Sequence, residues 1–99
     1  MSLRTLASCT LALMALGGIA QADETAPAVL ATACFACHGM DGKSPGQIPS
    51  LTGKTKEAFS TAMKGFKTDQ IPATVMNRLA KGYTDAEIEA LATFYANLK

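Results

Sequence analysis

The sequence has one histidine, His38, and only three cysteines in 99 residues, one of them inside an N-terminal leader. Structural zinc sites take four ligands, whereas the rest of the chain offers Cys34, Cys37 and His38. No convincing strand pattern is present, although a thioredoxin-like redox pair needs strands alternating with helices. A disulfide between Cys34 and Cys37 would close too short a loop to stabilise the fold much. These absences disfavour a structural zinc site, a thioredoxin-like redox pair and a structural disulfide as the role of Cys34 and Cys37.

The sequence also lacks an excess of charge of either sign. Charged residues make up 17% of the chain and apolar residues 48%, which is the composition of one folding domain. After residue 22 the chain has eight Lys and Arg residues and eight Asp and Glu residues. The sequence is therefore not basic enough to suggest a nucleic-acid partner, and net charge alone indicates no ionic partner of either sign.

No apolar run is long enough to span a bilayer, which takes roughly 20 residues. Residues 1–22 instead combine Arg4, an apolar run at 11–19 and the small-x-small ending Ala-Gln-Ala at 20–22. That order is typical of a secretory signal. We predict cleavage after Ala22 and a mature periplasmic domain of residues 23–99, without a membrane span.

A lipoprotein anchor is the competing interpretation of the leader. Leu-Ala-Ser-Cys at residues 6–9 resembles the sequence around a lipidated cysteine. In a lipoprotein signal the apolar run precedes the cysteine, whereas here it follows Cys9. Export with cleavage after Ala22 is therefore favoured over lipidation of Cys9.

The motif that carries chemistry is Cys34-Phe-Ala-Cys37-His38, the attachment signature of c-type haem. Residues i and i+3 share a helix face, so both sulfurs can bond one edge of the ring. The following histidine then lies where an imidazole nitrogen can bind iron. We predict one covalent haem c, held by Cys34 and Cys37 with His38 as an iron ligand. A domain of 77 residues has a small core and needs such a group to stabilise it.

The second iron ligand decides the function, because His/Met-ligated haem suits electron transfer and an open iron suits gas or peroxide chemistry. Among the mature methionines, Met40 is too near His38 for the chain to pass around the ring. Met63 falls on an apolar stripe of a predicted helix, where core filling is the usual role. Met76 follows a proline in a less regular segment. We predict Met76 as the ligand, with a short apolar helix face as its alternative role.

The expected fold is all-α, with three to four helices around the haem. A first helix from residue 25 or 26 to 37, with Pro27 in its first turn, should end at Gly39. Residues 39–53, rich in Gly and Pro, should form a loop around the haem. A second helix covers about 56–66, and a short helical turn lies near 77–81.

Two further patterns predict how these helices pack. Leu30, Ala33, Cys34 and Cys37 recur at helical spacing, so this stripe should turn inward. Thr84-Asp-Ala-Glu87 is a capping box that opens a last helix. We expect its apolar stripe to cross the first helix, where small residues such as Ala31 and Ala33 allow close approach. That stripe consists of Ile88, Leu91, Ala92, Tyr95 and Leu98, widened by Phe94.

The roles of the tyrosines and of six lysines each have two interpretations. Tyr83 and Tyr95 are most simply packing residues, and the alternative for Tyr83 is a hydrogen bond to a haem propionate. Six lysines either surround an exposed haem edge and steer a partner, or form an ordinary solvated surface. These are Lys43, Lys54, Lys56, Lys64, Lys67 and Lys81.

On these residues the chain resembles a small bacterial class I cytochrome c from residue 26 to 98. The likeness rests on the C-x-x-C-H-Gly motif, Asp-Gly at 41–42, Ile-Pro-Ser-Leu-x-Gly at 48–53 and Met76. The resemblance implies that the carbonyl of Pro49 orients the iron-bound imidazole of His38, and it supports Met76 as the second ligand. Residues 73–85 are similar to a segment of cytochrome subunits of flavocytochrome c sulfide dehydrogenases. Those subunits usually carry two haem domains, whereas this chain has one motif.

The leading functional prediction is a periplasmic one-electron carrier that is not an enzyme. Its partners would be a donor dehydrogenase or flavoprotein and an acceptor oxidase or another cytochrome. The alternative is the haem c subunit of a stable dehydrogenase complex, such as a flavoprotein sulfide dehydrogenase. An enzyme or gas sensor would need an open iron, which a suitable methionine and the lack of a second histidine disfavour.

Overall fold

The computed structural model describes residues 26–98. The predicted signal segment lies outside these residues. The described part is all-helical and contains no strand, which confirms the expected fold class. Three short elements run without a break as the first helical segment, α1 (Pro27–Leu30), η1 (Ala31–Cys34) and α2 (Phe35–His38). The remaining helices are α3 (Lys56–Lys67), α4 (Met76–Ala80) and α5 (Asp85–Asn97).

The first helical segment begins as predicted but is not a uniform α-helix. Pro27 occupies its first turn and Gly39 ends it. Between them, residues 31–34 form a 3₁₀ turn, and the Thr32 hydroxyl donates to the Val29 carbonyl at 2.7 Å. A 3₁₀ turn has about 3.0 residues per turn, which rotates the following residues relative to an α-helix. The predicted first helix is therefore a continuous helical segment with a 3₁₀ turn inside it.

Two helices start at a threonine whose side chain caps the first turn. The Thr84 hydroxyl accepts from the Glu87 amide at 3.1 Å, and the Glu87 carboxylate accepts from the Thr84 amide at 3.0 Å, so the predicted capping box is confirmed. The Thr55 hydroxyl accepts from the Ala58 amide at the start of α3. Such caps satisfy amides that have no partner within the helix.

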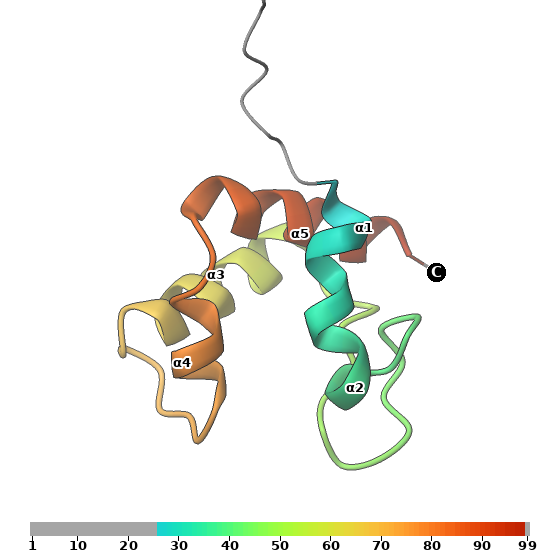
Figure 1. Ribbon diagram of the computed structural model, residues 1–99, viewed down its shortest axis with the longest axis horizontal. Helices are drawn as coiled ribbons and strands as arrows, with labels where there is room; N and C mark the ends of the chain where they lie inside the picture. Colours follow the sequence, from blue (N-terminus) through green and yellow to red (C-terminus); the bar gives the residue numbers. More distant parts are fainter. Residues whose placement is uncertain (1–25, 99) are drawn as a thin grey trace, which may run out of the picture.

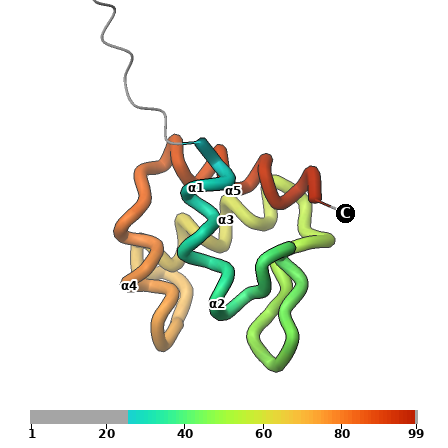
Figure 2. Tube along the Cα trace, turned by 45° about the vertical axis from the view of Figure 1, so that its right-hand side comes forward, coloured from blue at the N-terminus to red at the C-terminus, as the bar shows by residue number. Residues whose placement is uncertain are grey.

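The core lies where the first helical segment and α3 pack against α5. Figures 1 and 2 show the first segment crossing α5, with α3 behind them. Helix α4 packs against α3. The predicted stripe of α5 supplies four of the eight buried apolar residues, and α3, α4 and the first helical segment supply the others. Buried apolar residues are Ala31, Phe59, Met63, Ala80, Ile88, Leu91, Ala92 and Tyr95.

One packing prediction was half right. Ala31 is fully buried, as expected for a small residue at the crossing with α5. Ala33 and Cys37 are exposed instead of facing inward with Leu30 and Cys34. The 3₁₀ turn explains the difference, because a stripe calculated for 3.6 residues per turn no longer holds across it.

Candidate haem-binding site

The two cysteines of the motif lie on consecutive turns and differ in burial. Cys34 ends η1, is half-buried and packs against the core, whereas Cys37 lies in α2 and is exposed. Both are free thiols and do not form a disulfide with each other. The described residues also contain no group of three His, Cys, Asp or Glu side chains that could hold a metal ion. Both thiols therefore remain available for bonding to a prosthetic group.

A sharp turn follows the motif because residue 39 is a glycine. Gly39 has φ of +88°, and a Cβ atom there would lie 2.0 Å from the Lys43 carbonyl oxygen. The Asp41 carboxylate accepts from the Lys43 amide at 2.9 Å and closes the turn. The chain can therefore leave α2 at once and fold back beside it.

The loop of residues 39–55 is held by hydrogen bonds at its two ends. The Gly42 carbonyl accepts from the Leu51 amide at 2.7 Å and from the Thr52 amide at 3.2 Å. The Ser44 amide donates to the Ser50 hydroxyl at 2.9 Å. These bonds fix the second half of the loop next to the end of α2, and with it the carbonyl of residue 49.

His38 and Pro49 form the contact that the family resemblance implied. The Nδ1 atom of His38 lies 2.5 Å from the Pro49 carbonyl oxygen. A carbonyl can only accept, so Nδ1 carries the hydrogen and donates it. In the neutral ring, Nε2 then has a free lone pair. The imidazole is thus oriented and held in the tautomer that binds a metal through Nε2.

The three methionines among the described residues lie in three different environments. Met40 is 80% exposed, next to the histidine in sequence. Met63 is buried in the core on α3, as predicted for a residue of its apolar stripe. Met76 is the first residue of α4 and is half-buried against the core. Helices α2 and α4 stand apart in both views, so Met76 and His38 come from separate parts of the fold (Figures 1 and 2).

Exposed apolar side chains accompany these groups. Ile48 in the loop is 44% exposed, and Val75 and Leu79 at α4 are 54% and 48% exposed. The donor set consists of two free thiols, an imidazole with an available Nε2 atom and a half-buried thioether. Exposed apolar side chains could pack against a flat hydrophobic ring. This chemistry fits a c-type haem.

The hydroxyls of the two tyrosines lie in different environments. The Tyr83 hydroxyl donates to the Leu30 carbonyl at 3.3 Å, one turn before Cys34, and burial raises its pKa. This hydrogen is therefore used within the protein, which favours the packing role over a propionate contact. The Tyr95 ring is buried, and its hydroxyl has no hydrogen-bond partner among the described residues. Sequence patterns identified both rings as apolar surface but gave no signal for the contact of the Tyr83 hydroxyl.

Half of the six lysines considered above are ion-paired. Lys64 lies 2.6 Å from Glu89, Lys67 lies 3.0 Å from Asp85, and Lys81 lies 2.8 Å from Asp69. Pairs at the surface are ordinary features of a solvated face. The structure therefore favours that interpretation for Lys64, Lys67 and Lys81.

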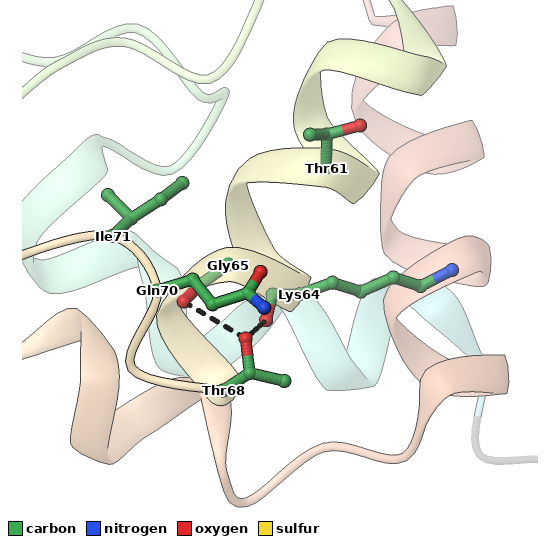
Figure 3. A pocket seen from close by; sticks show the side chains of 6 residues that line it. All are labelled: Thr61, Lys64, Gly65, Thr68, Gln70 and Ile71. Atoms are coloured by element: carbon green, nitrogen blue, oxygen red, sulfur yellow. Dashed lines mark hydrogen bonds between the residues drawn. The ribbon is translucent and has the colours of Figure 1, made fainter.

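A separate hollow of about 400 Å³ lies at the C-terminal half of α3 (Figure 3). Its walls are formed by Thr61, Lys64, Gly65, Thr68, Gln70 and Ile71. Lys64 is the one charged side chain among them, and it pairs with Glu89. The Thr68 hydroxyl bonds to helix carbonyls. These contacts leave the hollow without an evident chemical role.

No helix among the described residues has the length and apolarity needed to cross a membrane.

Comparison with known proteins gives consistent similarities. Residues 24–99 match the family model described as Cytochrome c. The chain is 44% identical over 75 residues to the cytochrome subunit of sulfide dehydrogenase from Chlorobaculum tepidum, covering 76% of this chain and 68% of that protein. It is 32% identical over 68 residues to cytochrome c-554(548) from Halomonas halodenitrificans, covering 65% and 82%. It is 30% identical over 89 residues to cytochrome c4 from Pseudomonas aeruginosa, covering 87% and 44%.

Proposed function

The chain belongs to the cytochrome c family of haem c electron-transfer proteins, and on this premise we propose a specific site and location for its electron transfer. In this proposal Cys34 and Cys37 tether one haem c through thioethers. His38 and Met76 bind the iron, and the protein works in the periplasm after export. It is an electron carrier and makes or breaks no substrate bond.

The hydrogen bond from His38 to Pro49 is the observation that carries the ligand assignment. By holding the Nδ1 proton, the Pro49 carbonyl fixes the ring orientation and leaves the Nε2 lone pair available to a metal. Without this partner the ring could rotate or carry its proton on the nitrogen that must bind.

The remaining residues hold and shield the site. When bound, haem c supplies an iron that accepts and releases one electron. The soft thioether of Met76 favours the reduced iron, which raises the reduction potential. The apolar side chains of α4 and the loop exclude water from the ring, and Met63 fills the core behind them. Two protein ligands in both redox states leave no position for substrate.

The test is the optical spectrum of the protein made in cells competent for haem maturation, in both redox states. We expect covalent haem, low-spin iron in both states and an iron–sulfur band in the far red of the oxidised spectrum. A colourless product with both thiols titratable would contradict haem attachment. Rapid carbon monoxide binding to the reduced protein at neutral pH would contradict closure by methionine.

A second candidate function is the haem subunit of a stable dehydrogenase complex. The specific support is the 44% identity to a protein described as the cytochrome subunit of sulfide dehydrogenase. Gel filtration of extract from the native host separates the two functions. A free carrier elutes at the size of the mature chain alone, whereas a subunit elutes with its flavoprotein or other partner.

A further inference from the structure

Gly65 lies buried near the end of α3, where the helix itself gains nothing from a glycine. Glycine in a helix interior is less favourable than alanine, because it loses more conformational freedom on folding. Its φ is not positive, so no unusual backbone angle requires it. The remaining physical reason for glycine at this position is a need for space.

The side chain of Ile71 occupies that space. A Cβ atom at Gly65 would clash with the Cδ1 atom of Ile71 and lie 2.6 Å from its Cγ1 atom. Because Cγ1 is also this close, turning the terminal methyl group would not relieve the clash, and a β-branched side chain has few alternative χ1 rotamers. An alanine at residue 65 would therefore push Ile71 away from α3.

The backbone between α3 and α4 is anchored at the same glycine. The Gly65 carbonyl accepts from the Gln70 amide at 2.9 Å and from the Ile71 amide at 3.1 Å. Asp69 turns the chain with φ of +59°, and its amide donates to the Phe66 carbonyl at 3.2 Å. This is the Schellman ending of a helix, closed by a residue in the left-handed conformation. The connection of residues 68–75 thus leaves α3 beside Gly65 (Figure 3).

A second link joins the start of this connection to the end of α4. The Lys81 ammonium donates to the Asp69 carboxylate at 2.8 Å and to the Asn77 carbonyl at 3.3 Å. Ion pairs at the surface contribute little to stability. The main anchor of the connection is therefore the contact between residues 65 and 71.

Helix α4 depends on such an anchor for its place. It has five residues, which is too short for a helix to be stable alone, and Val75 provides no side-chain cap. Met76, its first residue, follows Ile71 by only five positions. Pro72 between them has a fixed φ and restricts the residue before it. The position of Met76 therefore follows from that of Ile71.

We propose that Gly65 and Ile71 are positioning residues for the Met76 thioether, and that their contact sets how readily Met76 leaves the iron. This inference rests on the proposed ligation by Met76. The missing side chain at residue 65 lets Ile71 lie against α3, and the connection then holds α4 in one place. Both residues act through Met76 and are not ligands themselves.

Displacement of the methionine by added imidazole measures this control. In the oxidised, haem-loaded protein, the iron–sulfur bond breaks and a bond from iron to an imidazole nitrogen forms. No electron is transferred, and the methionine side chain is released unchanged. Imidazole binds only the form in which Met76 has left, so its apparent affinity rises as that form becomes more populated.

The experiment is a double-mutant cycle of Gly65→Ala and Ile71→Ala in the haem-loaded full chain, with imidazole titrated against the far-red iron–sulfur band. We expect Gly65→Ala to raise the imidazole affinity about tenfold, because overpacking displaces Ile71. Ile71→Ala should also raise it, because the anchor is lost. In that background Gly65→Ala should change the affinity by less than about twofold, since nothing remains to clash.

Gly46→Ala is the matched control for the added methyl group. A Cβ atom there would meet nothing within 4 Å, so the imidazole affinity should stay the same. Ile71→Val adds no atom and should give an affinity between those of the unchanged protein and Ile71→Ala. This variant keeps the test decisive even where Gly65→Ala takes up no haem.

A further measurement uses the unchanged protein. In the reduced, diamagnetic state, proton NMR should show a nuclear Overhauser effect between the Ile71 Cδ1 methyl group and the Gly65 Hα protons. Its absence, an unchanged affinity in Ile71→Ala, or an equal effect of Gly65→Ala in both backgrounds would overturn the proposal. A far-red band that is lost in Met76→Ala would still uphold the proposed function, whereas an unchanged oxidised protein without that band would overturn both.

Discussion

Glu89 on α5 accepts a hydrogen bond from Lys64 on α3 at 2.6 Å, and the same carboxylate oxygen accepts from the buried Ser60 hydroxyl. These two contacts join the two longest helices at one point. Both hydrogen bonds hold the pKa of Glu89 below its ordinary value of 4.5.

The pH dependence of stability follows from this shift. A carboxyl whose pKa is lowered by folding stabilises the protein above its unfolded pKa, and the stabilisation is lost as pH falls through the folded pKa. We expect the melting temperature to fall as pH drops below about 4.5, and to fall less steeply in Glu89→Gln. The control is Glu57→Gln, at an exposed position in the first turn of α3. Equal acid sensitivity of Glu89→Gln and the unchanged protein would contradict this role.

The methionine assignment is tested by a pair of substitutions. Met76→Ala should remove the far-red iron–sulfur band of the oxidised protein, because the thioether is lost. Met63→Ala should keep the band but lower the free energy of unfolding by about 2–5 kcal/mol, since it leaves a cavity at a position 6% exposed. Loss of the band in Met63→Ala instead would transfer the ligand role to that residue.

The turn after the motif should tolerate no side chain. Gly39→Ala must adopt φ of +88° and place its Cβ against the Lys43 carbonyl. We therefore expect its free energy of unfolding to fall by about 1–3 kcal/mol. Gly46→Ala is the control, because its Cβ would meet nothing within 4 Å, and it should change stability by about 0.5 kcal/mol or less. Chemical denaturation of both variants measures the difference. Similar unfolding midpoints would contradict the argument.

The predicted signal segment can be tested through the covalent structure of the exported protein. Intact-mass measurement of protein recovered from the periplasm should give a chain that begins at Asp23 and carries the mass of one haem. A mass that includes Met1 would contradict cleavage. A lipid attached to Cys9 would favour the lipoprotein interpretation.

Local signals made much of the fold predictable. The capping box at Thr84, the proline in the first turn of α1 and the glycine at 39 each act within a few residues of their own position, and each element boundary that they indicate is confirmed. The predicted end of the second helix at residue 66 differs by one residue from the observed end of α3. The exposure of Ala33 was missed because the 3₁₀ turn breaks the α-helical period.

The site residues likewise divide into those that a local motif identifies and those whose contacts are distant in the sequence. Cys34, Cys37 and His38 form a contiguous motif and could be identified by their spacing alone. The partner of His38 lies eleven residues away in an aperiodic loop, so only the family resemblance indicated Pro49. The bond from Tyr83 to the Leu30 carbonyl joins residues 53 apart. No pattern of apolar residues specifies which buried hydroxyl meets which distant acceptor.

Gly42 connects the loop to the core in a way that affects cooperativity. Its carbonyl binds the amides of Leu51 and Thr52, while its Cα lies against the Tyr95 ring. Opening the loop would therefore uncover an aromatic side chain from the centre of the molecule. Loops usually open locally at little cost, but this one should open only when α5 detaches. The amides of Leu51 and Thr52 would then exchange with deuterium as slowly as those of the last helix, and the haem environment would stay closed until the whole domain unfolds.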